Sequence, residues 1–267
     1  MKEKDYKKMA LDIRERIIDI GHNIKKEIHY GASLSLVEIL LALFYRNPIF
    51  DDSLILSKGH GALSLYLVMN MCGLITDEQM ESFKRNGSSL SALAEKNKEL
   101  SIEFSGGSLG MGLSYAVGKA LAFKKKDSAK KVYVILGDGE CNEGSVWEAA
   151  WSASFYGLDN IVAIIDDNHM QYDGPTEEIM GGANLEDKFR SFGWEVISVD
   201  GQDVLPVMNG LNIENTKPLA ILADTKKGAG ISFMENNPVW HNRLLTDNEY
   251  EKTKAEISEM RKIIGNK

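Results

Sequence analysis

The amino-acid sequence predicts an α/β fold with a doubly wound, mostly parallel sheet and helices on both of its faces. Short apolar runs typical of buried strands alternate with helical segments through the second half of the chain. Two of these runs, residues 131–136 and 161–166, lead directly into acidic and amide residues. Open α/β sheets bind their ligands at the carboxyl ends of the strands, so the same two runs predict where a functional site lies.

The first half of the chain is expected to be mainly helical. Apolar residues recur every three or four positions near the N-terminus, which is typical of an amphipathic helix. Asn47-Pro48 is expected to end a more apolar helix, because proline cannot continue one. The elements expected here are helices at 5–28, 35–45 and 60–71, a strand at 53–56, a helix capped by Thr76, and a long loop at 86–106.

Strands and helices alternate in the second half, where most of the sheet is expected. The strands are expected at 131–136, 161–166, 194–199 and 218–223, the helices at 108–123, 143–156, 184–192, 203–211 and 247–263, and a loop at 225–243. No internal repeat, low-complexity tract or linker interrupts the sequence. Residues 1–267 are therefore expected to form a single domain with a helical N-terminal extension.

The composition is that of a globular protein and excludes several functional classes. The formal net charge of −8 argues against a broad nucleic-acid-binding surface. Cys72 and Cys141 provide neither a disulfide framework nor the spacing of a zinc site. No signal-peptide core follows the first residues, and no apolar run reaches membrane-spanning length. A cytoplasmic protein without nucleic-acid or membrane partners is therefore expected.

The two strand ends carry the residues that point to chemistry. One run is followed by Gly137-Asp-Gly-Glu140 and the other leads into Asp166-Asp-Asn168. Asp138 and Asn168 offer a carboxylate and an amide oxygen, which suit Mg²⁺ or Ca²⁺, and Gly139 lets an anionic group approach the backbone. The 28 residues between Gly139 and Asn168 leave room for one crossover helix, which makes the two strands neighbours. This edge is therefore expected to hold a metal ion and a diphosphate together.

The segments 137–140 and 167–168 together resemble the thiamine diphosphate motif. Their surroundings resemble the N-terminal part of transketolases, because five further segments match that family in the same order. These segments are 56–60, 106–112, 143–150, 173–178 and 233–241. The resemblance covers residues 5–245 and implies the thiamine diphosphate-binding fold, with a domain of the type that binds the diphosphate.

The resemblance implies that thiamine diphosphate binds here through Mg²⁺ or Ca²⁺. The metal ligands that it implies are Asp138, Asn168 and the backbone carbonyl of Met170. The residues that it places at the cofactor are His60, Gly107, Ser108, Leu109, Asp138, Gly139, Glu140, Asn168, Met170 and His241. Judged by residue type alone, segment 106–112 also fits plain helix packing, so that interpretation stays open beside the binding of phosphate by backbone amides.

The catalytic residues implied by the resemblance are His29, His60, Glu143 and His241. The resemblance implies that His60 and His241 contact the diphosphate or the reacting substrate and that His29 binds oxygens of the donor. Histidine suits these roles because it can donate or accept a proton near neutral pH. Glu143 would lie at a subunit interface and meet the partner's glutamate that activates the aminopyrimidine ring. By residue type alone, Glu143 also fits an acid favoured at a helix N-terminus.

Two features depart from the family pattern. Leu93 stands where transketolases carry a histidine that contacts the donor, and because an apolar side chain cannot hydrogen-bond a hydroxyl, an unusual donor is expected. The chain also ends where the family continues into a second domain. It is therefore expected to be the N-terminal subunit of a split transketolase, completed by a separate C-terminal subunit with the pyrimidine-binding domain in an α2β2 complex.

The expected function is transketolase-like transfer of a two-carbon ketol unit between small sugars. The cofactor of this family adds to a ketose carbonyl and stabilises the resulting carbanion. Two alternatives stay open, namely a subunit of a decarboxylating thiamine diphosphate synthase and a non-catalytic cofactor-binding assembly subunit. The donor and acceptor sugars also stay open.

Overall fold

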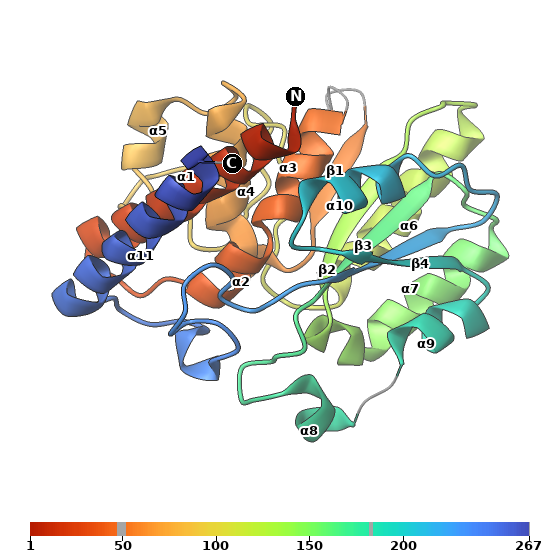
Figure 1. The fold of residues 1–267 in the computed structure, drawn as a ribbon. Helices are drawn as coiled ribbons and strands as arrows, with labels where there is room; N and C mark the ends of the chain where they lie inside the picture. The colour runs from red at the N-terminus through yellow and green to blue at the C-terminus, as the bar shows by residue number, and fades with distance from the viewer. Residues whose placement is uncertain (47–51, 182–183, 267) are drawn as a thin grey trace.

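A single sheet of five strands forms the centre of the computed structural model, which describes residues 1–46, 52–181 and 184–266 (Figure 1). The strand order is β1-β2-β3-β5-β4, and every neighbouring pair in these described residues is parallel. The strands are β1 (Ser53–Leu56), β2 (Val132–Gly137), β3 (Ile161–Asp167), β4 (Glu195–Asp200) and β5 (Leu219–Asp224). The expected α/β fold with a parallel sheet is confirmed.

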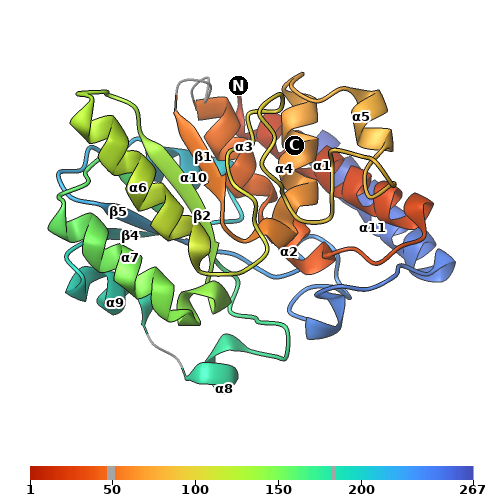
Figure 2. The same ribbon diagram turned by 180° about the vertical axis from the view of Figure 1, so that it is seen from behind.

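Helices cover both faces of this sheet. Figures 1 and 2 show α6, α7 and α9 on one face and α3 and α10 on the other, and α1 and α4 pack beyond α3. The helices are α1 (Glu3–Ile24), α2 (Tyr30–Ser35), α3 (Val37–Arg46), α4 (Ala62–Met71), α5 (Asp77–Glu81), α6 (Met111–Lys125), α7 (Gly144–Phe155), α8 (Thr176–Met180), α9 (Leu185–Ser191), α10 (Val204–Leu211) and α11 (Asp247–Asn266). Short 3₁₀ turns are η2 (Gly59–Gly61), η3 (Gly139–Asn142) and η4 (Pro238–Trp240).

Two hydrophobic cores result, one on each face. Successive side chains of a strand point to opposite faces, so Tyr133 and Ile135 join the core under α3 and α10, while Val134 and Leu136 join the core under α6 and α7. All four are buried, as expected for strands covered on both faces. Burying one such side chain contributes about 1.5–3 kcal/mol, so these apolar runs stabilise the central strands that carry the site.

The N-terminal helix is shorter than the sequence predicted. α1 ends at Ile24 because Lys25 takes the left-handed backbone conformation, with φ of 49°, that commonly closes helices. Ile28 then forms an isolated antiparallel bridge with Arg243 instead of continuing the helix. The predicted helix at 35–45 begins later, since Leu36 separates α2 from α3. Its predicted end at Asn47-Pro48 lies outside the described residues.

The other expected elements are confirmed within a few residues. Thr76 caps α5, and its hydroxyl accepts the backbone N–H of Gln79 at 3.2 Å. Residues 82–110 contain neither helix nor strand, as predicted for a long loop at 86–106. The single turn α8 was not predicted, because five residues are too few to show a helical period.

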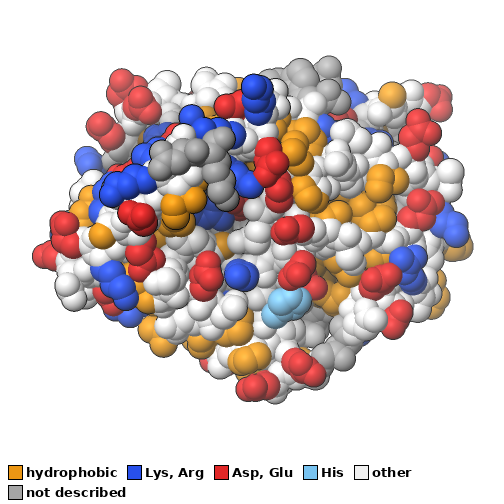
Figure 3. Space-filling view, viewed as in Figure 1, with side chains coloured by type: hydrophobic (Ala, Val, Ile, Leu, Met, Phe, Trp, Pro, Cys, Tyr) orange, Lys and Arg blue, Asp and Glu red, His pale blue; other side chains and the backbone are white. Residues whose placement is uncertain are grey.

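The terminal helices α1 and α11 lie side by side and are joined by charged pairs. Lys254 contacts Glu15 and Asp19, and Arg261 contacts Asp12 and Glu15. Acidic and basic side chains are accordingly mixed over this helix pair in Figure 3. Of the helices in the described parts of the chain, none is long and apolar enough to span a bilayer.

Candidate active site

A cavity of about 790 Å³ lies where the carboxyl ends of β2 and β3 meet. Its walls come from the segments that follow β1, β2, β3 and β5, from the start of α2, and from the long loop between α5 and α6. These segments are far apart in sequence and meet only because the strands are parallel and adjacent. The cavity therefore occupies the sheet edge that the sequence predicted.

The predicted metal ligands come together at this cavity. Asp138 follows β2 and Asn168 follows β3, and each is 4% exposed. The N–H of Asp138 donates to the carbonyl of Asp166 at 3.2 Å, which fixes the two strand ends against each other. The amide oxygen of Asn168 accepts the N–H of Met170 at 3.2 Å, so the chain turns back at this point. Both Asn168 and Met170 line the cavity.

Three histidines form a second cluster in the same cavity. The rings of His29, His60 and His241 have centroids 5.5–5.7 Å apart. Burial lowers the pKa of His29 to about 4 and that of His241 to about 3, and nearby lysines add to both shifts. Burial also lowers the pKa of His60 well below its ordinary value. The three rings are therefore neutral near pH 7 and can act as both donors and acceptors.

Two buried lysines that the sequence analysis did not assign also face the cavity. Lys58 and Lys227 are each 2% exposed. The Nζ of Lys227 donates to the carbonyl of Gln171 at 2.6 Å and more weakly to that of Met170 at 3.4 Å. Burial and then Lys58 lower the pKa of Lys227 to about 8. Two buried ammonium groups in one cavity suit an anionic ligand. The sequence could have indicated Lys58 as a site residue, because it lies inside the matched segment 56–60.

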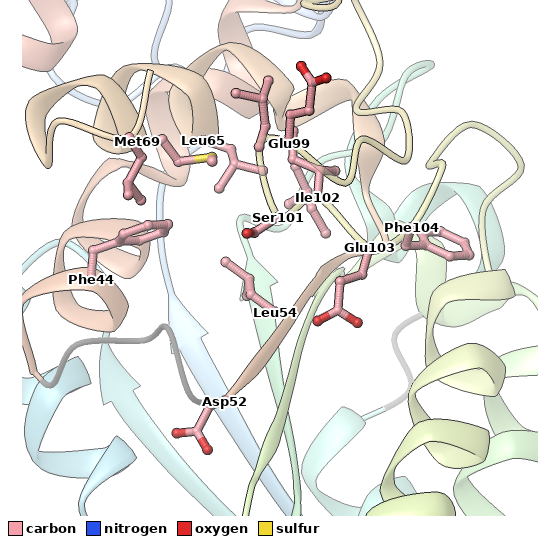
Figure 4. Close-up of a pocket in the computed structure, with 13 residues that line it drawn as sticks. Phe44, Asp52, Leu54, Leu65, Met69, Glu99, Ser101, Ile102, Glu103 and Phe104 are labelled. Carbon is pink, nitrogen blue, oxygen red and sulfur yellow. The ribbon is translucent and has the colours of Figure 1, made fainter. Parts of the chain in front are cut away.

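A smaller cavity elsewhere has a different character. It has a volume of about 200 Å³ and is lined largely by apolar side chains such as Phe44, Leu65 and Met69, with Asp52 and Glu103 among its polar residues (Figure 4). The histidines, lysines and strand-end carboxylates lie at the larger cavity instead. Clustered titratable groups with shifted pKa values mark functional sites, so the larger cavity is the candidate.

Comparisons with known proteins agree with this geometry. Residues 6–261 match the family described as transketolase, thiamine diphosphate binding domain. The chain is 39% identical to a subunit of the apulose-4-phosphate transketolase of Actinobacillus succinogenes, over 96% of both chains. The chain belongs to the transketolase family. It is also 39% identical, over 88% of both chains, to the 6-deoxy-6-sulfo-D-fructose transketolase subunit SqwG of a Clostridium species.

Solved transketolases share the fold but are longer. The transketolase of Campylobacter jejuni superposes with a TM-score of 0.85 at 27% identity, over 95% of this chain and 43% of that chain. The chain thus spans less than half the length of that transketolase and corresponds to its thiamine diphosphate binding domain. The sequence-based identification of the transketolase family and of its cofactor-binding fold is confirmed.

The strand-end oxygens of this transketolase chain fit a divalent cation. Burial raises the pKa of Asp138 and raises that of the neighbouring Asp167 to about 6. Lys58 near Asp138 and His169 near Asp167 offset this desolvation only in part. In the described part of the chain, no group of three His, Cys, Asp or Glu side chains could hold a metal. A cation here would depend on the amide of Asn168 and the carbonyl of Met170, which are oxygen ligands suited to Mg²⁺ or Ca²⁺.

The glycine-rich residues are only partly at the cavity. Gly107 and Leu109 line it, whereas Ser108 is exposed and is not part of its wall. Gly139 lines it too, and a Cβ there would come within 2.8 Å of the Cγ of Gln171. Any larger residue at position 139 would have to displace the side chain of Gln171, so glycine lets these two segments approach closely.

The two predicted glutamates differ in their surroundings. The buried carboxylate of Glu140 accepts the hydroxyl of Ser57 and the N–H groups of Gly110 at 2.9 Å and Gly137 at 3.1 Å. It therefore joins the loop before α6 to β2. Glu143 is exposed at the cavity, directly before α7. The side chain of Glu143 is thus available to another chain.

Leu93 is brought to the cavity, as the sequence predicted. Leu93 and Ala92 line it together and give the long loop an apolar surface there. The hydroxyl of Ser91 donates to the carbonyl of Leu93 at 2.5 Å, and that of Ser88 lies 2.7 Å from the hydroxyl of Ser82. Neither Ser88 nor Ser91 lines the cavity, so neither replaces the missing polar group there.

Proposed function

We propose that this chain is the N-terminal subunit of a split transketolase that transfers a two-carbon ketol unit between small sugars. The main observation behind this proposal is that one cavity combines buried oxygen atoms at the strand ends, two buried lysines and three neutral histidines. Support also comes from two relatives of nearly equal length that are named as transketolase subunits. We further propose that residues 1–267 form one domain, since a single parallel sheet organises the described residues. We also propose that the chain acts in the cytoplasm, where cysteines such as its two free thiols stay reduced.

The strand-end residues would hold Mg²⁺ and the cofactor. Asp138, Asn168 and the carbonyl of Met170 supply three oxygens, which leaves ligand positions for diphosphate oxygens and water. Lys58 and Lys227 lie at the same cavity and would bind the diphosphate charge. Gly107, Leu109 and Gly139 would lie along the cofactor, and Ser108 and Glu140 would contact it only through backbone atoms.

The histidines would handle the protons of the substrates. Thiamine diphosphate, when bound, supplies an electron sink for the carbanion chemistry of ketol transfer. His29, His60 and His241 are neutral, so each can hydrogen-bond a sugar hydroxyl or a carbonyl oxygen. His241, whose Nδ1 lies 3.0 Å from Lys227, would do so as a donor through Nε2. Their rings lie within 6 Å of one another, so one two-carbon unit could contact all three.

A separate subunit would complete the site. Glu143 faces the cavity from the exposed start of α7, where a partner's glutamate could meet it. Such a partner would carry the pyrimidine-binding domain, and two copies of each subunit would form an α2β2 complex. Exposed apolar residues Trp151 and Phe155 on α7 support a contact with another chain on this helix.

The test is reconstitution of this chain with the product of a neighbouring gene that encodes a pyrimidine-domain subunit. The pair, with thiamine diphosphate and Mg²⁺, is expected to transfer ketol units in a panel of ketose donors and aldose acceptors, and neither chain by itself is expected to be active. Release of CO₂ from 2-oxo acids without ketol transfer would instead show a decarboxylating synthase. Cofactor binding without turnover on either panel would show a non-catalytic assembly subunit.

A further inference from the structure

The carboxylate of Asp166, near the end of β3, joins this strand end to three other segments. Asp166 is fully buried, and Ser35 of α2 donates to its Oδ2 at 2.6 Å. The ammonium of Lys58, which follows β1, donates to the same oxygen, as does the amide of Asn168 at 3.4 Å. The hydroxyl of Thr225, which follows β5, donates to Oδ1. Both oxygens are thus hydrogen-bonded, as a buried carboxylate requires.

We propose that Asp166 is a positioning residue that sets the orientation of the Asn168 amide and the location of the Lys58 ammonium together. It lies between the two groups and also accepts the backbone N–H of Asp138 through its carbonyl. It would therefore link the metal side of the site to its anion-binding side. The inference rests on the proposed function, because Mg²⁺ and thiamine diphosphate are the ligands these groups would hold.

The orientation of the Asn168 amide follows from the chemistry of its two neighbours. An ionised carboxylate can only accept hydrogen bonds, so the Nδ2 of Asn168 must face Asp166. The Oδ1 then faces the other way, where the N–H of Met170 donates to it at 3.2 Å. Since a metal binds the amide oxygen and not the nitrogen, the carboxylate at position 166 selects the ligating form of Asn168. An amide at position 166 could donate to Oδ1 and favour the flipped form.

The location of Lys58 depends on the same carboxylate. Its ammonium is buried, and Asp166 is the acidic partner that it contacts. A buried ammonium without a counter-charge is strongly unfavourable, so the ion pair with Asp166 holds the Lys58 ammonium at the cavity wall. A single side chain thus prepares both halves of a site for a metal–diphosphate complex.

The proposal is tested with Asp166→Asn in the reconstituted pair. Binding of thiamine diphosphate is followed by equilibrium dialysis at increasing Mg²⁺ concentration. The Mg²⁺ midpoint, which is the Mg²⁺ concentration that gives half-maximal cofactor binding, is expected to rise by about tenfold or more. Losses of this size are typical when a residue that hydrogen-bonds a metal ligand is replaced. The matched control is Asp224→Asn, the same substitution at the end of the neighbouring strand β5. Asp224 is exposed and bonds to His169 at 3.0 Å, so its midpoint is expected to change by less than about twofold.

A second variant tests separately whether Asp166 sets the location of the Lys58 ammonium. At saturating Mg²⁺, Lys58→Met should weaken cofactor binding less in the Asp166→Asn background than in the native one, because the ammonium is already misplaced there. Equal losses in both backgrounds would overturn this part. An unchanged Mg²⁺ midpoint in folded Asp166→Asn would overturn the Asn168 part.

A measurement on the free chain, without Mg²⁺ or cofactor, tests the positioning role of Asp166 independently of the proposed function. In the free chain, Asp166→Asn should speed hydrogen exchange at the N–H of Met170, which loses its acceptor when Asn168 flips. If the native pair bound no cofactor while this exchange changed, the function would be wrong and the positioning role would stand. If Asp166→Asn failed to fold, Ser35→Ala combined with Thr225→Val would keep the carboxylate but loosen it. An unchanged midpoint in that variant would overturn the proposal.

Discussion

The Nζ of Lys227 lies 3.0 Å from the Nδ1 of His241, and the same ammonium donates to the carbonyl of Gln171. Because an ammonium has only donors, Nδ1 of His241 is the acceptor and the ring carries its proton on Nε2. Lys227 therefore selects the tautomer of a cavity histidine and also reaches the carbonyl of Met170 at 3.4 Å. One lysine connects the proposed metal ligand to a proposed catalytic group.

Lys227→Met should weaken binding of thiamine diphosphate to the assembled enzyme. A hydrogen bond to a charged group contributes about 1.5–3 kcal/mol, which corresponds to a loss of roughly 10- to 150-fold in affinity. Calorimetry on the reconstituted pair measures this directly. The control is Lys226→Met. The side chain of Lys226 is exposed, and its Nζ lies 3.8 Å from an Oε atom of Glu235, which is a weak ion pair. The control variant should bind the cofactor normally. Equal effects of the two variants would contradict the role given to Lys227.

His29 should make the folded chain sensitive to acid. Burial lowers its pKa from 6.5 to about 4, so the unfolded chain takes up a proton in this range that the folded chain does not. The free energy of unfolding therefore falls as the pH drops from about 6.5 to about 4. His29→Gln should remove part of this loss, as measured by urea unfolding at pH 4.5 and 7. His22→Gln, a change on α1 outside the cavity, should keep it, and the same pH dependence in His29→Gln as in the native chain would refute the prediction.

Asp138→Ala should abolish Mg²⁺-dependent binding of thiamine diphosphate. Asp138 supplies the only carboxylate among the three proposed ligands, so its loss would leave the cation with only two neutral oxygen ligands from the protein. Removing Mg²⁺ with a chelator should have the same effect on the native pair. Thr176→Val removes a hydroxyl that donates to Asp138 at 2.5 Å and should weaken binding only moderately. Unchanged affinity in Asp138→Ala by calorimetry would exclude this metal site.

The isolated chain should associate with itself or with its partner. Phe155 on α7 is 77% exposed and Trp151 is one turn away on the same face, so this helix presents a large apolar surface. Obligate interfaces commonly bury more than about 2,000 Å². Phe155→Ser should weaken association in analytical ultracentrifugation, whereas Ile263→Ser on the exposed side of α11 should not. A monomeric chain with full activity would rule out the proposed assembly.

The sheet could be predicted from the sequence because its strands are buried on both faces. A continuous apolar run such as the one around Val134, when helical segments precede and follow it, is best explained as a buried strand of a parallel sheet. The end of α1 was harder to predict. Residues 25–28 lack glycine or proline, and the helix stops because Lys25 adopts a left-handed backbone and Ile28 pairs with Arg243, which is distant in the sequence. Such long-range pairing overrides local propensity.

The candidate site was predictable where a motif places a residue at a strand end, as for Asp138 and Asn168. It was not predictable where the role depends on burial. Lys227 lies 57 residues from Met170 in sequence, and only the fold brings its ammonium to that carbonyl. The same holds for Asp166, since its four donors come from segments after β1, β3 and β5 and from α2. Spacing in a sequence does not show which polar groups share a buried partner.

Leu93 should direct the enzyme away from ordinary ketose phosphates. It lines the cavity with Ala92 on the loop that faces the histidines, so a donor hydroxyl placed there loses a hydrogen bond. An unmade hydrogen bond of this kind costs about 1–3 kcal/mol, which predicts weak activity of the native pair on donors such as xylulose 5-phosphate.

Leu93→His should raise kcat/KM on such donors and lower it on the native donor, because imidazole can bind the hydroxyl that leucine cannot. Leu93→Met keeps the surface apolar at similar volume and should leave the donor preference unchanged. The two variants and the native pair are compared on one panel of ketoses at fixed acceptor. Robust turnover of xylulose 5-phosphate by the native pair would show that Leu93 only packs beside Gly107 and does not select the donor. The two residues are close, since a Cβ added to Gly107 would lie 3.7 Å from the Cδ1 of Leu93.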